Sequence, residues 1–150
     1  MTAYLEVSKV DVATAQLDRA IQLYLENDDL ISSITLSGAA EEILGKLVSQ
    51  GGQRNAFDET IDRLCEMHVV AYQEEPDRTK YTFLSNEVRN EFKHLCTGTT
   101  LEVNLDAESG ALIGRAIENY KKLFPGSYPR FREFEQEWIN RQNAIVAATE

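Results

Sequence analysis

The sequence predicts an all-α protein, an up-and-down bundle of about five to six helices that forms a single domain over residues 1–150. Three observations predict this class. Apolar residues recur at helical spacing in segment after segment. The connections between these segments are short and rich in glycine, proline, asparagine or aspartate. The 150 residues include 43% apolar and 27% charged side chains, as in ordinary globular domains with one core.

Two helices are expected in the first third of the chain. The first covers about residues 8–26, where the turn-forming residues 27–29 end it. The second covers roughly residues 30–49 and ends at the glycine pair 51–52. Small residues at 37–40 would let another helix approach the second one closely. The apolar stripes comprise Val10, Ala13, Leu17, Ala20, Ile21 and Tyr24 in the first helix, and Leu36, Ala40, Ile43, Leu44 and Leu47 in the second.

The middle of the chain predicts two more helices. One covers about residues 55–73 and is stopped by residues 74–77. Residues 80–83 fit either a short extended piece or a helical lead-in. Ser85 is the expected N-cap of the next helix, which continues to about Cys96 with its apolar stripe facing the core. The two stripes comprise Phe57, Ile61, Leu64, His68 and Tyr72, then Val88, Phe92 and Leu95.

The last third predicts a loop and two helices. Residues 97–105 are rich in glycine and β-branched residues, so we expect a loop there. Asp106 is the expected N-cap of a helix that ends at Leu123, and Pro129 suits the first position of a final helix. The expected packing residues are Ile113, Ala116, Ile117, Tyr120 and Leu123, then the core- or dimer-packing residues Phe131, Phe134, Trp138 and Ile145.

Composition restricts the possible partners. The net charge of −10 would repel a polyanion over most of the surface, so RNA chemistry would need a local basic cleft. Alternatively, the acidity would serve to engage a basic partner. No apolar run approaches the ~20 residues of a membrane span, so no membrane partner is expected. The start of the chain lacks the pattern of a signal peptide, and two cysteines suit a reducing compartment, so we expect a cytoplasmic protein.

A polar motif lies in the helix expected after Ser85. Asn90 and His94 are four residues apart, so they stack and point away from the apolar stripe, with Arg89 on its flank. A histidine suits a general base that removes a ribose 2′-hydroxyl proton, and a guanidinium suits a phosphate clamp. Asn90 would orient the imidazole or the phosphate. Arg89 and His94 are ~140° apart on one helix, so a complete site would require two copies of the chain.

The motif carries a family resemblance. Arg89-Asn90-x-x-x-His94 resembles the Arg-polar-x-x-x-His signature of the HEPN superfamily, small all-α domains of bacterial toxins, defence systems and RNA-processing enzymes. Residues 37–46 resemble the Ala/Glu-rich second helix of those domains, and the resemblance extends to Leu123. It implies a homodimer whose two motifs form the catalytic site of a toxin- or defence-type endoribonuclease. That enzyme would cut single-stranded RNA without a metal or cofactor.

The resemblance also implies accessory residues and partners. Glu41 or Glu42 would pair with Arg89, as an acidic residue of that helix does in relatives, although a simple surface charge pair is an equal alternative. Lys93 is a further accessory candidate. An antitoxin or another protein would be the cognate partner. Many toxin-type members carry a tyrosine that their antitoxins modify at the position of Cys96, which argues against regulation by that route here.

Two other interpretations compete with the ribonuclease. The chain would be a non-catalytic interaction or nucleotide-binding module if the fold and dimer persist without catalysis. The charge of −10 favours that module, whereas the intact motif favours the enzyme. Cys65-x-x-His68 and His94-x-Cys96 contain the residue types of a zinc site. His68, however, lies on an apolar stripe, as a hydrogen-bonded core histidine would, and no metal is expected.

Overall fold

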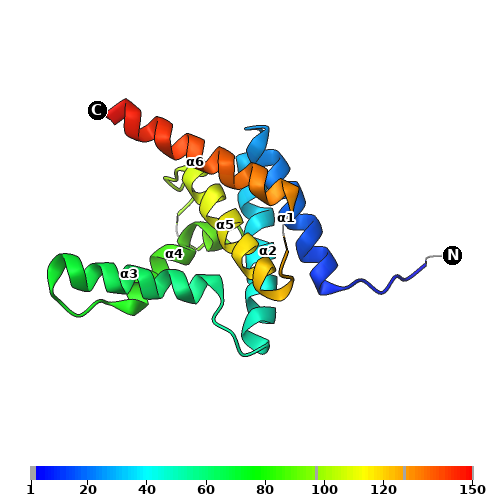
Figure 1. The fold of residues 1–150 in the computed structure, drawn as a ribbon, viewed down its shortest axis with the longest axis horizontal. Coiled ribbons are helices and arrows are strands. Elements are labelled where there is room, and N and C mark those ends of the chain that lie inside the picture. The colour runs from blue at the N-terminus through cyan, green and yellow to red at the C-terminus, as the bar shows by residue number, and fades with distance from the viewer. Residues whose placement is uncertain (1–2, 97, 127, 150) are drawn as a thin grey trace.

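The computed structural model describes residues 3–96, 98–126 and 128–149. These residues form helices and no strand, which confirms the all-α bundle predicted from the sequence. The six helices are α1 (Lys9–Leu25), α2 (Leu30–Gln50), α3 (Ala56–Tyr72), α4 (Arg78–Glu91), α5 (Leu105–Leu123) and α6 (Pro129–Thr149) (Figure 1).

Side-chain caps define where most of the helices begin. Ser8, Asp29, Asn55, Asp77 and Asn104 precede α1 to α5, and each accepts a hydrogen bond from the backbone N–H three residues later. Such caps satisfy N–H groups that have no partner within the helix. The N-cap of α5 is Asn104 and not Asp106, which the sequence suggested. The helix begins two residues earlier because the side chain of Asn104 already offers an acceptor.

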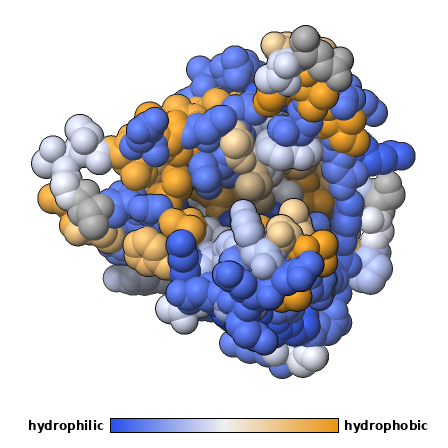
Figure 2. Space-filling view, turned by 90° about the vertical axis from the view of Figure 1, so that its left-hand side faces the viewer, coloured by the Kyte–Doolittle hydropathy of each residue, from blue (hydrophilic) through white to orange (hydrophobic). Residues whose placement is uncertain are grey.

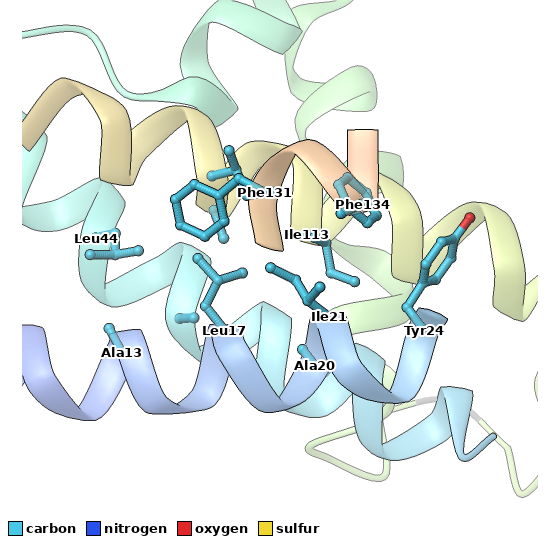
Figure 3. Close-up of a cluster of buried hydrophobic side chains, with 12 residues drawn as sticks. Ala13, Leu17, Ala20, Ile21, Tyr24, Leu44, Ile113, Phe131 and Phe134 are labelled. Carbon is cyan, nitrogen blue, oxygen red and sulfur yellow. The ribbon is translucent and has the colours of Figure 1, made fainter. Parts of the chain in front are cut away.

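The core lies between α1, α2, α5 and α6. Leu17, Ile21 and Tyr24 of α1 face Ile113 of α5 and Phe134 of α6 in the close-up view (Figure 3). The rings of Tyr24 and Phe134 meet edge to face with centroids 5.2 Å apart. The buried apolar residues that contact one another in this cluster are Ala13, Leu17, Ala20, Ile21, Tyr24, Ala40, Leu44, Ile113, Ala116, Ile117, Phe131 and Phe134.

Helices α3 and α4 form a hairpin that projects sideways from this bundle, and we call residues 56–91 the arm (Figure 1). Only Ala56 and Ile61 of α3 are fully buried, and no residue of α4, all of which the structure describes, is buried. His68 of α3 and Tyr81 of α4 share a hydrogen bond of 2.9 Å across the hairpin. The arm therefore contributes little to the core.

The helix that carries the polar motif differs from its prediction at both ends. Asp77, not Ser85, is its N-cap, so residues 80–83 are a helical lead-in. The helix ends at Glu91, and the carbonyl of Asn90 accepts the N–H groups of both residue 93 and residue 94 in a closing turn. His94 therefore lies beyond the helix.

The predicted core face of this helix is also wrong. Val88 and Phe92 are only half-buried, and Leu95 is 82% exposed. The physical reason is that α4 belongs to the arm, where it packs on α3 and touches α2 at its base. Helical spacing identified an apolar face, but little of the molecule covers it.

Within the part of the chain that the structure describes, no helix is long and apolar enough to cross a membrane.

Candidate functional site

The site is built around the buried carboxylate of Glu41 on α2. Arg89 of α4 donates from Nη1 to Glu41 Oε2 at 2.8 Å, and Arg115 of α5 places Nε 3.6 Å from Oε1. Only 3% of the Glu41 side chain is exposed, against 15% for Arg89 and 11% for Arg115. One carboxylate thus joins three helices through two guanidinium groups, and the interaction of Glu41 with Arg89 is not a surface charge pair.

Small residues of α2 make room for this arrangement. A Cβ added at Gly38 would lie 2.9 Å from Cγ of Arg89, so a larger residue there would push the arginine away. Gly38 is one turn before Glu41 on the same helix, which lets the Arg89 stem cross α2 and reach the carboxylate. The small residues at 37–40 were expected to let another helix approach, and at Gly38 the group that comes close is the Arg89 side chain.

Arg115 is held in an unusual environment for a cation. Burial lowers its pKa from the ordinary arginine value, while the charge of Glu41 opposes this shift. Its guanidinium lies over the ring of Phe57, 5.6 Å from the centroid. Burial also raises the pKa of Glu108 on the same helix. The buried Nε atoms of Arg89 and Arg115 have no hydrogen-bond partner within the described residues.

Glu42 forms a second, more exposed cluster next to Glu41. Lys46 donates to Glu42 at 2.8 Å and Lys93 at 3.2 Å. These contacts lower the pKa of Glu42 to about 2. The hydrogen bond from Lys46 is the largest cause, and the hydrogen bond from Lys93 and the charges of both lysines add to it. Lys93 is therefore committed to a carboxylate of the same chain.

The structure divides the predicted motif. Arg89 points inward to Glu41, whereas Asn90 and His94 are both exposed. A small cavity of about 130 Å³ adjoins Arg89, and neither Asn90 nor His94 lines it. Its walls come from Glu41, Glu42, Gly45, Lys46, Asn55, Phe57 and Arg89. A single copy of the chain thus brings the arginine to the two glutamates but not to the histidine.

Two polar residues that were not predicted from the sequence complete this centre. Arg115 and Asn119 of α5 are four residues apart in phase with the buried Leu112. Oδ1 of Asn119 accepts the N–H of Ala56 at the start of α3 (2.8 Å), and its Nδ2 donates to the Glu41 carbonyl (3.4 Å). The signal in the sequence that could have identified Arg115 and Asn119 is their helical spacing from the apolar Leu112.

The cysteines and histidines do not gather into a metal site. Among the residues that the structure describes, no three His, Cys, Asp or Glu side chains are grouped to hold an ion. Cys65 is half-buried in α3, and Cys96 is exposed beyond α4. His68 uses Nδ1 for its hydrogen bond with Tyr81, as expected of a packed histidine.

Comparison of the chain with models of protein families, with curated proteins and with solved structures found no match. The resemblance to the HEPN superfamily therefore depends on the motif and the helix order alone.

Proposed function

We propose that the protein is a non-catalytic interaction module that binds another protein surface through its arm. The observation that carries the proposal is the apolar surface of α3 and α4. A soluble fold rarely leaves a concentration of large apolar side chains uncovered unless they bind something. The exposed large apolar residues of the arm are Met67, Val69, Val70, Tyr72, Phe83 and Leu84.

The shape of the molecule supports the same function. Figure 2 looks at the side toward which the arm points, and hydrophobic surface appears there in several patches between hydrophilic ones. The main apolar cluster of the bundle contains none of residues 56–91, and only Ala56 and Ile61 at the start of α3 are buried. The arm is thus free to serve a partner while the bundle maintains the fold.

The state of Arg89 also favours a non-catalytic role. Its Nη1 donates to a carboxylate with 3% exposure, and withdrawing it would leave the buried charge of Glu41 with Arg115 alone. Leaving a buried charge poorly paired is costly. An arginine with this structural task is a poor candidate for a phosphate clamp.

In-cell photo-cross-linking tests the proposal. A photoreactive amino acid at Phe83, which is 63% exposed on the arm, should yield a covalent adduct with a protein. The same amino acid at Ile31, which is 57% exposed on α2, provides a matched control and should yield little. Equal adduct formation at both positions, or none at Phe83, would contradict a specific interface on the arm.

A metal-independent endoribonuclease is the second candidate, because Asn90 and His94 remain exposed for a second copy or an RNA to reach. Such an enzyme would cut single-stranded RNA in EDTA and leave a 2′,3′-cyclic phosphate, with His94 as base. The His94→Ala variant should then lose ~10²–10⁴-fold in rate. Arg89→Ala is not a clean test, since it also removes the partner of Glu41. Parent activity equal to that of His94→Ala would exclude this candidate.

A further inference from the structure

One face of α4 carries an amphipathic pattern whose central side chains its own chain leaves exposed. Lys80, Phe83, Leu84 and Glu87 are spaced i, i+3, i+4 and i+7, so they form one stripe along two turns of the helix. We call these four residues the α4 stripe. Phe83 is 63% and Leu84 50% exposed, so the centre of the stripe faces solvent.

The ends of the α4 stripe carry opposite charges. Lys80 is nearer the tip of the arm and Glu87 nearer its base. Neither side chain forms an ion pair with any residue that the structure describes. Lys80 is exposed and Glu87 half-buried. Burial raises the pKa of Glu108 on α5, and the charge of Glu87 adds to this shift.

The α4 stripe is complementary to a second copy of itself that runs in the opposite direction. If two α4 helices pack antiparallel with their centre between Phe83 and Leu84, each position n meets position 167 − n of the other helix. Phe83 then meets the partner's Leu84, and Lys80 meets the partner's Glu87. A two-fold axis makes both contacts twice, as isologous interfaces require. Apolar residues in the centre with opposite charges outside them are the pattern by which helix pairs fix register.

We propose that the arm binds a second copy of this chain, through antiparallel pairing of the two α4 stripes about a two-fold axis. This inference rests on the proposed function and names its partner. Figure 1 shows that the arm projects sideways from the bundle, and Phe83 and Leu84 at the centre of the α4 stripe are exposed. One helix pair is a small interface, so we expect a dissociation constant on the order of 10–100 μM.

This pairing differs from the dimer that the ribonuclease requires. Asn90 is 6.5 residues from the pairing centre, which at 1.5 Å per residue separates the two copies of Asn90 by about 20 Å along the axis. The two motifs therefore do not converge on one phosphate. The dimer formed by the α4 stripes therefore has no composite catalytic site, which only the endoribonuclease would require.

Sedimentation equilibrium of charge-swap variants tests the inference. The parent should show a monomer–dimer equilibrium. Lys80→Glu and Glu87→Lys should each raise the dissociation constant about tenfold, because two symmetry-related ion pairs become repulsive at once. The double variant Lys80→Glu/Glu87→Lys should restore the parent value, since the pairs are re-formed with reversed sign. All of these residues lie outside the core, so thermal melts should confirm that the variants fold.

Lys9→Glu is the matched control, because it makes the same charge change at an exposed position on α1. It should leave the dissociation constant unchanged. Three results would overturn the pairing: a parent that stays monomeric up to about 500 μM, a double variant that remains as weak as the single ones, or an equal effect of Lys9→Glu. If the parent is monomeric but Phe83 still cross-links to a different protein, the interaction module stands and only the second copy is excluded.

Discussion

At the scale of single residues, the molecule depends on one carboxylate that two arginines share. Glu41 is surrounded by protein on α2, and Arg89 and Arg115 supply its compensating charge from two other helices. A buried ion pair contributes little net stability compared with an apolar replacement, but removal of one partner is expensive. Arg89 therefore has a structural role, the neutralisation of the buried Glu41 carboxylate, that does not depend on catalysis.

Glu41→Gln should accordingly destabilise the protein by about 3–5 kcal/mol, because it leaves two guanidinium groups without their buried counter-charge. Urea unfolding measures the difference. Glu42→Gln is the matched control on the neighbouring residue, whose side chain is 38% exposed and paired with two lysines. It should cost less than about 1 kcal/mol. A similar, small effect of both changes would show that the Glu41 centre is not important for stability.

Glu42 gives a pH-dependent expectation of its own. Its pKa is lowered from 4.5 in the unfolded chain to about 2 in the fold, so it stabilises the protein above pH 4.5. That contribution is lost as the pH falls from 4.5 towards 2, because the carboxylate must then be protonated. The urea midpoints of the parent and of Glu42→Gln should therefore differ most at neutral pH and converge over this range. A constant difference would contradict the assignment.

At the scale of helices, a glycine of α5 determines how α6 packs on the bundle. The Trp138 side chain of α6 can lie directly against α5 because position 110 is a glycine. A Cβ added at Gly110 would overlap the ring of Trp138, which packs against the core. Large rings cannot move far in a packed interior, so a side chain at position 110 would displace Trp138 or α6.

Alanine substitutions at two glycines of α5 should have opposite effects. Gly110→Ala should cost at least about 1–3 kcal/mol, since it overpacks the contact with Trp138. Gly114→Ala meets no atom within 4 Å and should gain about 0.5–1 kcal/mol of helix propensity. Thermal melting of the two variants against the parent measures both. The same sign for both would mean that α6 is not held against α5 at Gly110.

Much of the helical framework was predictable from the sequence, because caps and breakers are local. Ser8 and Asn55 were recognisable as helix starts, and Pro129 as the start of α6. What covers a helix is not local. The stripe that ends in Leu95 has the correct spacing for a core face, yet it lies on an arm that the bundle does not enclose. Phe92→Ala should consequently cost less than the ~3–5 kcal/mol of a fully buried phenylalanine.

The candidate site was predictable only in part for the same reason. A carboxylate of α2 close to Arg89 was expected, and Glu41 confirms it. Arg115 completes the centre from α5, 26 positions further along the chain, and no periodicity within α4 points to it. The sequence predicted that Asn90 and His94 lie on one face of a helix. Because α4 ends at Glu91, this prediction does not hold for His94.

At the scale of the whole molecule, charge and shape favour association over nucleic-acid chemistry. The net charge of −10 opposes a polyanion, and among the described residues Lys46, Lys93, Arg89 and Arg115 all have carboxylate partners in the same chain. The arm offers apolar surface with a charge pattern that matches its own reverse. The interaction module therefore needs no rearrangement of the fold, whereas the ribonuclease needs Arg89 to serve two roles.

Site-directed disulfide formation distinguishes the antiparallel pairing of two arms from a dimer in which the two motifs converge. In a Cys65→Ser/Cys96→Ser background, a single cysteine would replace either Leu84, next to the proposed two-fold axis, or Asn90, in the motif. Only cysteines whose Cα atoms come within ~7 Å can form a disulfide without backbone movement. If the two α4 stripes pair, mild oxidation should give a covalent dimer of Leu84→Cys and little of Asn90→Cys on a non-reducing gel. Rapid cross-linking of Asn90→Cys with none of Leu84→Cys would rule out this pairing and support the convergent dimer of the ribonuclease.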